Sequence, residues 1–195
     1  MAEDRTALSG VLPDDAIKVS RAFVSVHDKT GLAEFAKFLS DRGVEIIATG
    51  GTTSFLHQAG LEVTPAQEIT GFSEILSGKV KSLSPRLHAG ILFDRSSRQE
   101  AEHVRQEGLV PIDMVVVNFY PFQDVKEESS LSEALSMIDI GGPAALRAAA
   151  KNFRWVVPVP EPSAYGRVMD DMSRLSRASG DGPASGAPSR STGVM

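Results

Sequence analysis

The segment Thr49-Gly50-Gly51-Thr52 has the composition of an anion-binding turn. It follows an apolar run and leads into a helix-like run, so its backbone N–H groups would stand at a helix start. Glycines let a backbone approach a ligand closely, and helix starts favour negative charge. The threonine hydroxyls could add hydrogen-bond donors. A plain turn with a helix cap is the alternative interpretation, so the segment alone predicts either a phosphate site or a cap.

Charged residues in three other loops, and in the helix that follows the last of these loops, could complete such a site. Together with the histidine beside them, they are His27, Asp28, Lys29, Lys79, Lys81, Asp139, Arg147 and Lys151. Arg147 and Lys151 are four residues apart and share a helix face. Taken singly, the lysines could be solvated surface residues, and Asp139 could cap the helix that follows it.

An alternation of strands and helices must position these loops. The sequence predicts strands at 21–27, 44–48, 62–64 (an edge), 112–118 and 154–159, and helices at 30–42, 50–60, 97–108, 130–137, 142–152 and 162–175. Such alternation favours an α/β fold with parallel strands, in which ligands bind beyond the carboxyl ends of the strands. Pro158 and Pro160 favour an edge position for the last strand. We expect 68–93 to be a long functional loop, 1–20 a polar leader, 21–175 the domain, and 176–195 a disordered tail rich in Gly, Ser, Pro and Ala.

Composition excludes several classes of function. A chain of 195 residues with 42% hydrophobic and 23% charged residues is typical of one soluble domain. The net charge of -5 argues against a nucleic-acid partner, and no apolar run reaches the roughly 18–20 residues that span a membrane. There is no cysteine, the first residues do not resemble a secretory signal, and the spacing of His57, His88 and His103 indicates no metal site. We therefore expect a cytoplasmic protein that binds a small molecule.

Five segments, read in chain order, resemble one known family. They are VSVHDKTGLAEFAKFL, IIATGGTTSFLHQAGLEVT, EITGFSEILSGKVKSLSPRLHAGIL, IDMVVVNFYPF and MIDIGGPAALRAAAKN. They resemble the N-terminal IMP cyclohydrolase (inosinicase) domain of the bifunctional AICAR formyltransferase/IMP cyclohydrolase family, over about residues 21–165. The resemblance implies a methylglyoxal-synthase-like fold, a three-layer α/β/α sandwich with a central, mostly parallel sheet.

The resemblance also implies an activity. The carboxamide nitrogen of a phosphorylated ribonucleotide, FAICAR, would attack its own formyl carbon and lose water to give IMP, with no metal or organic cofactor. The domain would form a homodimer, with active sites completed near the subunit interface. Because the formyltransferase domain is absent from this sequence, the expected enzyme is a stand-alone cyclohydrolase, and a separate formyltransferase is an expected partner.

Site residues follow from the resemblance by position. Those expected to bind the substrate are His27, Asp28, Lys29, Thr49, Gly50, Gly51, Thr52, Lys79, Val80, Ser82, Val117, Asn118 and Ile140. The family associates the positions of Lys81, Tyr120, Asp139 and Lys151 with chemistry. Lys81 and the Tyr120 hydroxyl could stabilise charge on the formyl oxygen, and Asp139 and Lys151 could form a proton-relay pair.

Four departures from the family pattern leave alternatives open. Lys79 replaces an arginine, Ser82 a threonine and Ser84 a histidine, while His27 stands where a serine is common. One alternative is a paralogue that closes the ring of a FAICAR analogue in nucleoside antibiotic biosynthesis. Another is a non-catalytic nucleotide-phosphate sensor. A methylglyoxal synthase would account for His27-Asp28 but not for NFYPF or the AAAKN helix.

Overall fold

A five-stranded parallel sheet forms the centre of the computed structural model, which describes residues 17–72, 81–120 and 130–179. In the order β3-β2-β1-β4-β5, the strands are β3 (Thr64–Pro65), β2 (Glu45–Ala48), β1 (Arg21–Val26), β4 (Met114–Asn118) and β5 (Val157–Val159). Every pairing is parallel. The predicted α/β class is therefore confirmed. The two strands expected at edges, near residues 62–64 and at Pro158, are the edge strands.

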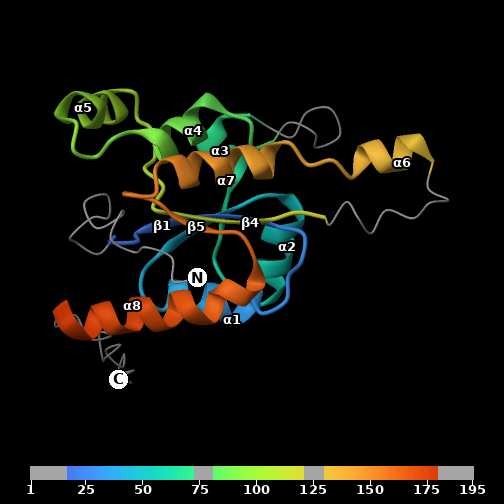
Figure 1. Cartoon of the computed structure of the whole chain (residues 1–195), viewed down its shortest axis with the longest axis horizontal. Coiled ribbons are helices and arrows are strands. Elements are labelled where there is room, and N and C mark those ends of the chain that lie inside the picture. Colours follow the sequence, from blue (N-terminus) through green and yellow to red (C-terminus); the bar gives the residue numbers. More distant parts are fainter. Residues whose placement is uncertain (1–16, 73–80, 121–129, 180–195) are drawn as a thin grey trace, which may run out of the picture.

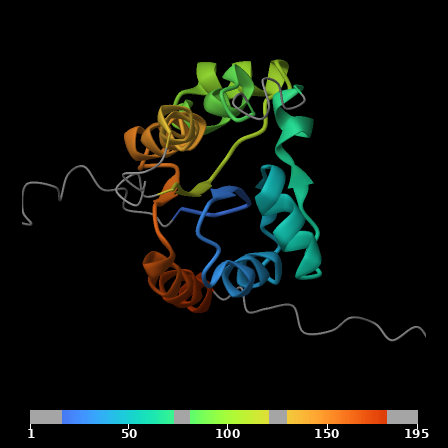
Figure 2. The ribbon, with the colours of Figure 1, turned by 90° about the vertical axis from the view of Figure 1, so that its right-hand side faces the viewer.

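Helices cover both faces of this sheet, which gives three layers (Figures 1 and 2). One face carries α1 (Leu32–Ser40), α2 (Gly50–Gln58), the short 3₁₀ helix η3 (Pro162–Ala164) and α8 (Tyr165–Ser179). The other carries α3 (Ala66–Thr70), α4 (Pro85–Leu92), α5 (Arg98–Gln106) and α7 (Gly141–Lys151). The sixth helix, α6 (Leu131–Ser136), projects away from the sheet in Figure 1. Across the described ranges, no helix is both long and apolar enough to cross a membrane.

The alternation of side chains along each strand divides the core in two. Successive side chains of a strand point to opposite faces, and in β1 Val24 joins the α1 side while Phe23 joins the α7 side. Both residues are buried, as expected for a parallel sheet covered on both faces. Leu32 and Leu39 fill the first layer, and Ile91 lies in the second.

The expected long loop at 68–93 is wrong in part, because it contains most of α3 and all of α4. Pro85 starts α4, at a position where a helix tolerates proline. Gly90, which suggested a loop, is buried inside α4, and a Cβ there would collide with the Val110 carbonyl. The glycine thus serves close packing rather than a turn. At the other end of the domain, α8 continues past Leu175, where its end was predicted, to Ser179.

Candidate active site

A cavity of about 660 Å³ lies at the carboxyl ends of β1 and β4. From β1, the chain first adds β2 and β3 on one side of the sheet and then returns to add β4 and β5 on the other side. The strand order therefore reverses between β1 and β4. Ligands of open parallel sheets bind at such a reversal, and the volume is typical of small-molecule sites. The lining residues are Ser25, Val26, His27, Lys29, Thr49, Gly51, Thr52, Lys81, Ser82, Asn118, Phe119, Leu135, Met137, Ile138, Asp139, Ile140 and Gly142.

Most of the residues expected at the site meet here. Ten of them line the cavity: His27, Lys29, Thr49, Gly51, Thr52, Lys81, Ser82, Asn118, Asp139 and Ile140. Gly50 instead borders a small adjoining hollow next to Lys81. Asp28, Val117, Tyr120 and Lys151 are described but do not line the cavity, and Lys79 and Val80 lie outside the described residues.

The hydroxyls of the Thr-Gly-Gly-Thr turn are used by the fold more than expected. Thr52 is buried, and its Oγ1 accepts the Val26 N–H at 3.2 Å and donates to the Val26 carbonyl at 3.3 Å. The Thr49 hydroxyl lies 2.8 Å from that of Ser25. Because one of these two hydroxyls donates to the other, the pair keeps one proton for a ligand. Ser25 was not predicted, although it is the polar residue in the otherwise apolar end of β1.

Asn118 organises the loop after β1. Its Oδ1 accepts the N–H groups of His27 and Asp28, each at 2.8 Å, and its Nδ2 donates to the Asp28 carbonyl at 2.9 Å. Hydrogen bonds from Thr30 lower the pKa of the Asp28 carboxyl, and its Oδ1 accepts the Thr30 N–H at 2.9 Å. Lys29 Nζ donates to the His27 carbonyl at 3.2 Å. The loop is thus held in place with the Lys29 ammonium at the cavity.

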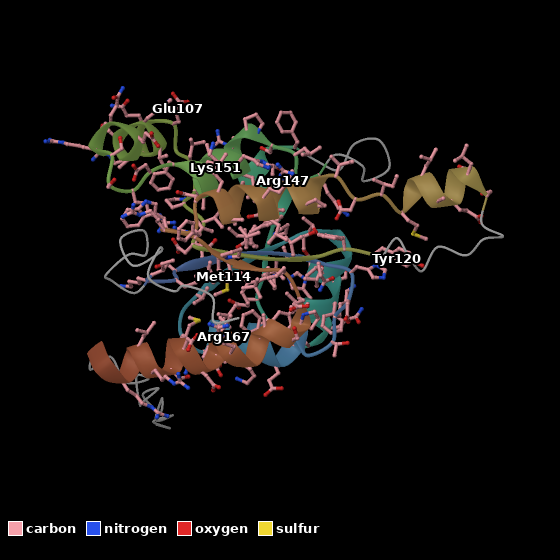
Figure 3. The ribbon with its side chains drawn as sticks, in the orientation of Figure 1. Glu107, Met114, Tyr120, Arg147, Lys151 and Arg167 are labelled. Atoms are coloured by element: carbon pink, nitrogen blue, oxygen red, sulfur yellow. The ribbon has the colours of Figure 1, made fainter. Side chains whose placement is uncertain are left out.

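Tyr120 reaches the site through His27. The two rings make an edge-to-face contact, with centroids 5.1 Å apart and planes at 88°. Tyr120 is half-buried, and His27 is exposed and lines the cavity. Figure 3 labels Tyr120 just beyond the end of β4. Its hydroxyl therefore belongs to the rim rather than to the lining.

The start of α7 forms the wall that carries Asp139. One carboxylate oxygen of Asp139, Oδ1, accepts the Gly142 N–H at 3.2 Å, so the residue does cap the helix. Among the described residues, its Oδ2 has no hydrogen-bond partner. Lys81, half-buried, lines the same cavity from the segment before α4. A cation and a carboxylate from different segments thus share one cavity.

Lys151 lies elsewhere in the single chain. It is the last residue of α7, about 15 Å along the helix axis from Gly141. Figure 3 shows Lys151 and Arg147 along the helix, away from Tyr120. Both side chains are exposed. One chain therefore does not bring Asp139 and Lys151 together, and the expected proton-relay pair cannot form within it, because a rigid helix separates the two.

An apolar wall lies on the side of α6, and of its residues only Ile140 was predicted at the site. Leu135, Met137, Ile138 and Ile140 line the cavity and are between 41% and 58% exposed. Met137 is thus far more exposed than Met114, which is buried in the core. The α6 helix begins with a capping box, in which the side chains of Ser130 and Glu133 each accept the other residue's backbone N–H. Helical spacing at 130–137 predicted the helix but not the face it presents.

No cluster of three or more His, Cys, Asp or Glu side chains suited to a metal ion occurs within the described ranges. The donors at the cavity are instead ammonium, hydroxyl, amide and backbone N–H groups. Such donors suit an anionic ligand.

Comparisons with known proteins agree with this architecture. Residues 31–144 match the model of the MGS-like domain. The chain is 47% identical over 157 residues to the bifunctional purine biosynthesis protein PurH of Clostridium acetobutylicum, and 46% identical over 157 residues to PurH of Magnetococcus marinus. These matches cover 80% of this chain but 32% and 30% of the relatives, so the chain spans about a third of their length. A crystal structure of ForH superposes with a TM-score of 0.73 and 31% identity, covering 84% of this chain and 81% of ForH. The chain therefore belongs to the family of MGS-like domains.

Proposed function

We propose that this domain is an IMP cyclohydrolase, which closes the six-membered ring of FAICAR by loss of water. The observation that carries the proposal is that Lys81 and Asp139 line one cavity together with Lys29 and the Ser25–Thr49 hydroxyl pair. Lys29 and the hydroxyl pair are the cation and the hydrogen-bond donors that a phosphate needs. Lys81 and Asp139 are the acid and the base that ring closure needs. The similarity to a domain-sized part of PurH supports the same activity.

The reaction closes the ring and releases the formyl oxygen as water. The carboxamide nitrogen attacks the formyl carbon to form the new C–N bond and gives up one proton. The formamide nitrogen gives up the second proton and forms a C=N bond as the C–O bond breaks, so that the oxygen leaves as water. Holding the two groups in contact removes much of the barrier, because the reaction is intramolecular. The Lys81 ammonium would stabilise charge on the formyl oxygen, and Asp139 Oδ2 would accept a proton from the nitrogen.

The test is turnover by this chain alone, supplied with FAICAR made by a separate formyltransferase. We expect the absorbance of IMP to rise, and Asp139→Asn to abolish the rise. Binding of FAICAR without turnover would favour the sensor instead, and release of methylglyoxal from dihydroxyacetone phosphate would favour a methylglyoxal synthase.

A homodimer is the second part of the proposal, and the position of Lys151 supports it. Since one chain holds Lys151 away from its own cavity, a catalytic Lys151 would have to act in the cavity of a second copy. The exposed apolar side chains of Leu131 and Leu135 on α6 offer a surface that a second copy could cover.

Mixing two inactive variants tests this arrangement. Lys151→Ala and Asp139→Asn subunits would be combined, and light scattering would establish the dimer. If each site draws Asp139 from one chain and Lys151 from the other, half of the dimers are mixed and each has one intact site. About a quarter of the wild-type activity would then return. Absence of recovery in confirmed mixed dimers would contradict the shared site, and full activity of Lys151→Ala would remove Lys151 from the mechanism.

A second candidate, closure of a FAICAR analogue, is favoured by one observation. His27, which stands where the family commonly has serine, lines the cavity beside Tyr120. A larger ring at this point changes the space left for the base. Efficient turnover of FAICAR would remove the main support for the analogue, whereas turnover only of a ring-modified substrate would establish it.

A further inference from the structure

The first two residues of α7 are glycines, although the backbone conformation at these positions does not require glycine. Gly141 and Gly142 are both buried, and neither is among the glycines with positive φ in the described ranges. Glycine in a helix is otherwise unfavourable relative to alanine, because it gives up more conformational freedom on folding. The reason for the pair must therefore be space.

The space is taken by two side chains of the cavity wall. A Cβ on Gly141 would collide with the Ser82 hydroxyl oxygen, although the next atom, Ser82 Cβ, would be 3.6 Å away. A Cβ on Gly142 would lie 2.5 Å from Asp139 Oδ2 and 3.1 Å from Val117 Cγ1. By contrast, a Cβ on Gly51 or Gly166 would meet nothing within 4 Å.

Packing against the sheet limits the space around the start of α7. Val117 belongs to the inner strand β4 and is fully buried, and its Cγ1 would also lie close to a Cβ on Gly142. The Gly142 N–H also donates to Asp139 Oδ1, which fixes the carboxylate over the glycine. Ser82, the residue that a Cβ on Gly141 would meet, is buried and is the next residue after Lys81 in the chain. A methyl group at either position would thus displace a polar group of the cavity rather than the helix.

We propose that Gly141 and Gly142 are positioning residues of the active site. Gly141 sets the orientation of the Ser82 hydroxyl, and Gly142 holds the Asp139 carboxylate in its capping position. The inference rests on the proposed function for its catalytic meaning, but the steric relationships do not depend on the substrate.

A double-mutant cycle between Gly141 and Ser82 tests the first relationship. Gly141→Ala and Ser82→Ala are each expected to lower kcat/KM for FAICAR about fivefold, the value of one hydrogen bond. The double variant is expected to lose no more than either single variant, because the hydroxyl is already misplaced or absent. Gly166→Ala, a helical glycine with open space, serves as the control and keeps full activity. Additive losses would overturn the role of Gly141.

The second relationship is read from Gly142→Ala. Displacing the carboxylate should reduce kcat by at least about tenfold, while the dissociation constant of IMP changes less than about twofold. A purely structural defect would not separate these two quantities. Wild-type kcat in Gly142→Ala would overturn the role of Gly142.

Urea unfolding separates a failure of this inference from a failure of the proposed function. Even if the wild type closes no ring, Gly141→Ala should lower the unfolding midpoint relative to Gly166→Ala, and added Ser82→Ala should restore it. Equal midpoints for Gly141→Ala with and without Ser82→Ala would overturn the steric relationship itself.

Discussion

The side chain of Asn118 pairs with the backbone of Asp28 as a neighbouring strand would. Its Oδ1 accepts the Asp28 N–H at 2.8 Å and its Nδ2 donates to the Asp28 carbonyl at 2.9 Å. The last residues in register between β1 and β4 are Val26 and Asn118, so the amide extends the pairing beyond the sheet. The loop that carries Lys29 to the cavity is therefore anchored by one side chain.

Replacing Asn118 by alanine should release this loop. We expect the free energy of unfolding to fall by about 1–2 kcal/mol, since these bonds are exposed, and kcat/KM to fall about tenfold or more through misplaced groups. Urea unfolding and FAICAR kinetics measure the two effects. Asn118→Asp is the matched variant, because it keeps the acceptor and loses the donor, and its defect should be intermediate. A fully active Asn118→Ala would show that the loop needs no anchor.

Lys81 and Asp139 should affect the chemical step more than binding. Lys81→Met and Asp139→Asn are each expected to lower kcat by about 10²–10⁴, because each removes a charge used in the transition state. Calorimetric titration with IMP should show dissociation constants within a few fold of the wild type. The control is Arg174→Met, which removes an exposed cation on α8 and should alter neither quantity. If kcat stays unchanged while IMP binding is lost, both residues bind substrate and do no chemistry.

The contact between His27 and Tyr120 predicts that an aromatic ring at position 27 matters for the placement of Tyr120. His27→Phe keeps the edge-to-face contact, worth about 0.5–1.5 kcal/mol, and should retain most of kcat. His27→Ser removes the contact and should lower kcat about three- to tenfold. Steady-state kinetics decide the matter. Equal losses in both variants would indicate that the imidazole itself takes part in the reaction.

The hydroxyl group of Tyr165 destabilises the core in which it is buried. The residue is 4% exposed, its ring stacks on Phe35 at 4.4 Å, and its hydroxyl has no hydrogen-bond partner in the described part of the chain. Tyr165→Phe keeps the stack and removes the orphaned hydroxyl, so we expect the free energy of unfolding to rise by about 1 kcal/mol. Tyr165→Leu, which loses the stack, should fall below the wild type in urea unfolding.

The same residue predicts a loss of stability at high pH. Burial, helped by the nearby negative charge of Asp28, raises the pKa of Tyr165 from 10.0 to about 12. Because the folded state holds this proton more tightly, its contribution is intact below pH 10 and is lost as the pH rises from 10 to about 12. Unfolding measured across this range should show a shallower decline for Tyr165→Phe than for the wild type. Parallel curves would contradict the shift.

The sequence predicted the sheet well because its strands are short apolar runs separated by helical spacing. The segment 112–118 contains β4, and Pro158 correctly indicated an edge strand. The prediction failed at α4, where Gly90 and Pro85 read as loop residues. Their positions are explained by tertiary packing and by the first turn of a helix, and neither cause is visible in local propensity.

The sequence predicted which residues lie at the site better than it predicted the hydrogen bonds between them. Spacing and resemblance placed Lys29, Lys81 and Asp139 around one cavity, as the structure does. They did not reveal that the Thr52 hydroxyl is consumed by Val26, because that bond joins residues 26 positions apart in the chain. The length of α7, which separates Lys151 from Asp139, could have been foreseen from helical rise alone.

The central pairing of β1 with β4 also bears on how the domain folds. It joins Ala22 to Met114 and Val26 to Asn118, so the two sides of the cavity come from segments that are far apart in the sequence. Contacts of such long sequence separation form late, because loop closure must precede them. Until β4 arrives, β1 presents an open, apolar strand edge that could pair with other chains. We therefore expect ligand-binding capacity to appear only in the last phase of refolding, and fragments that end before β4 to aggregate rather than bind.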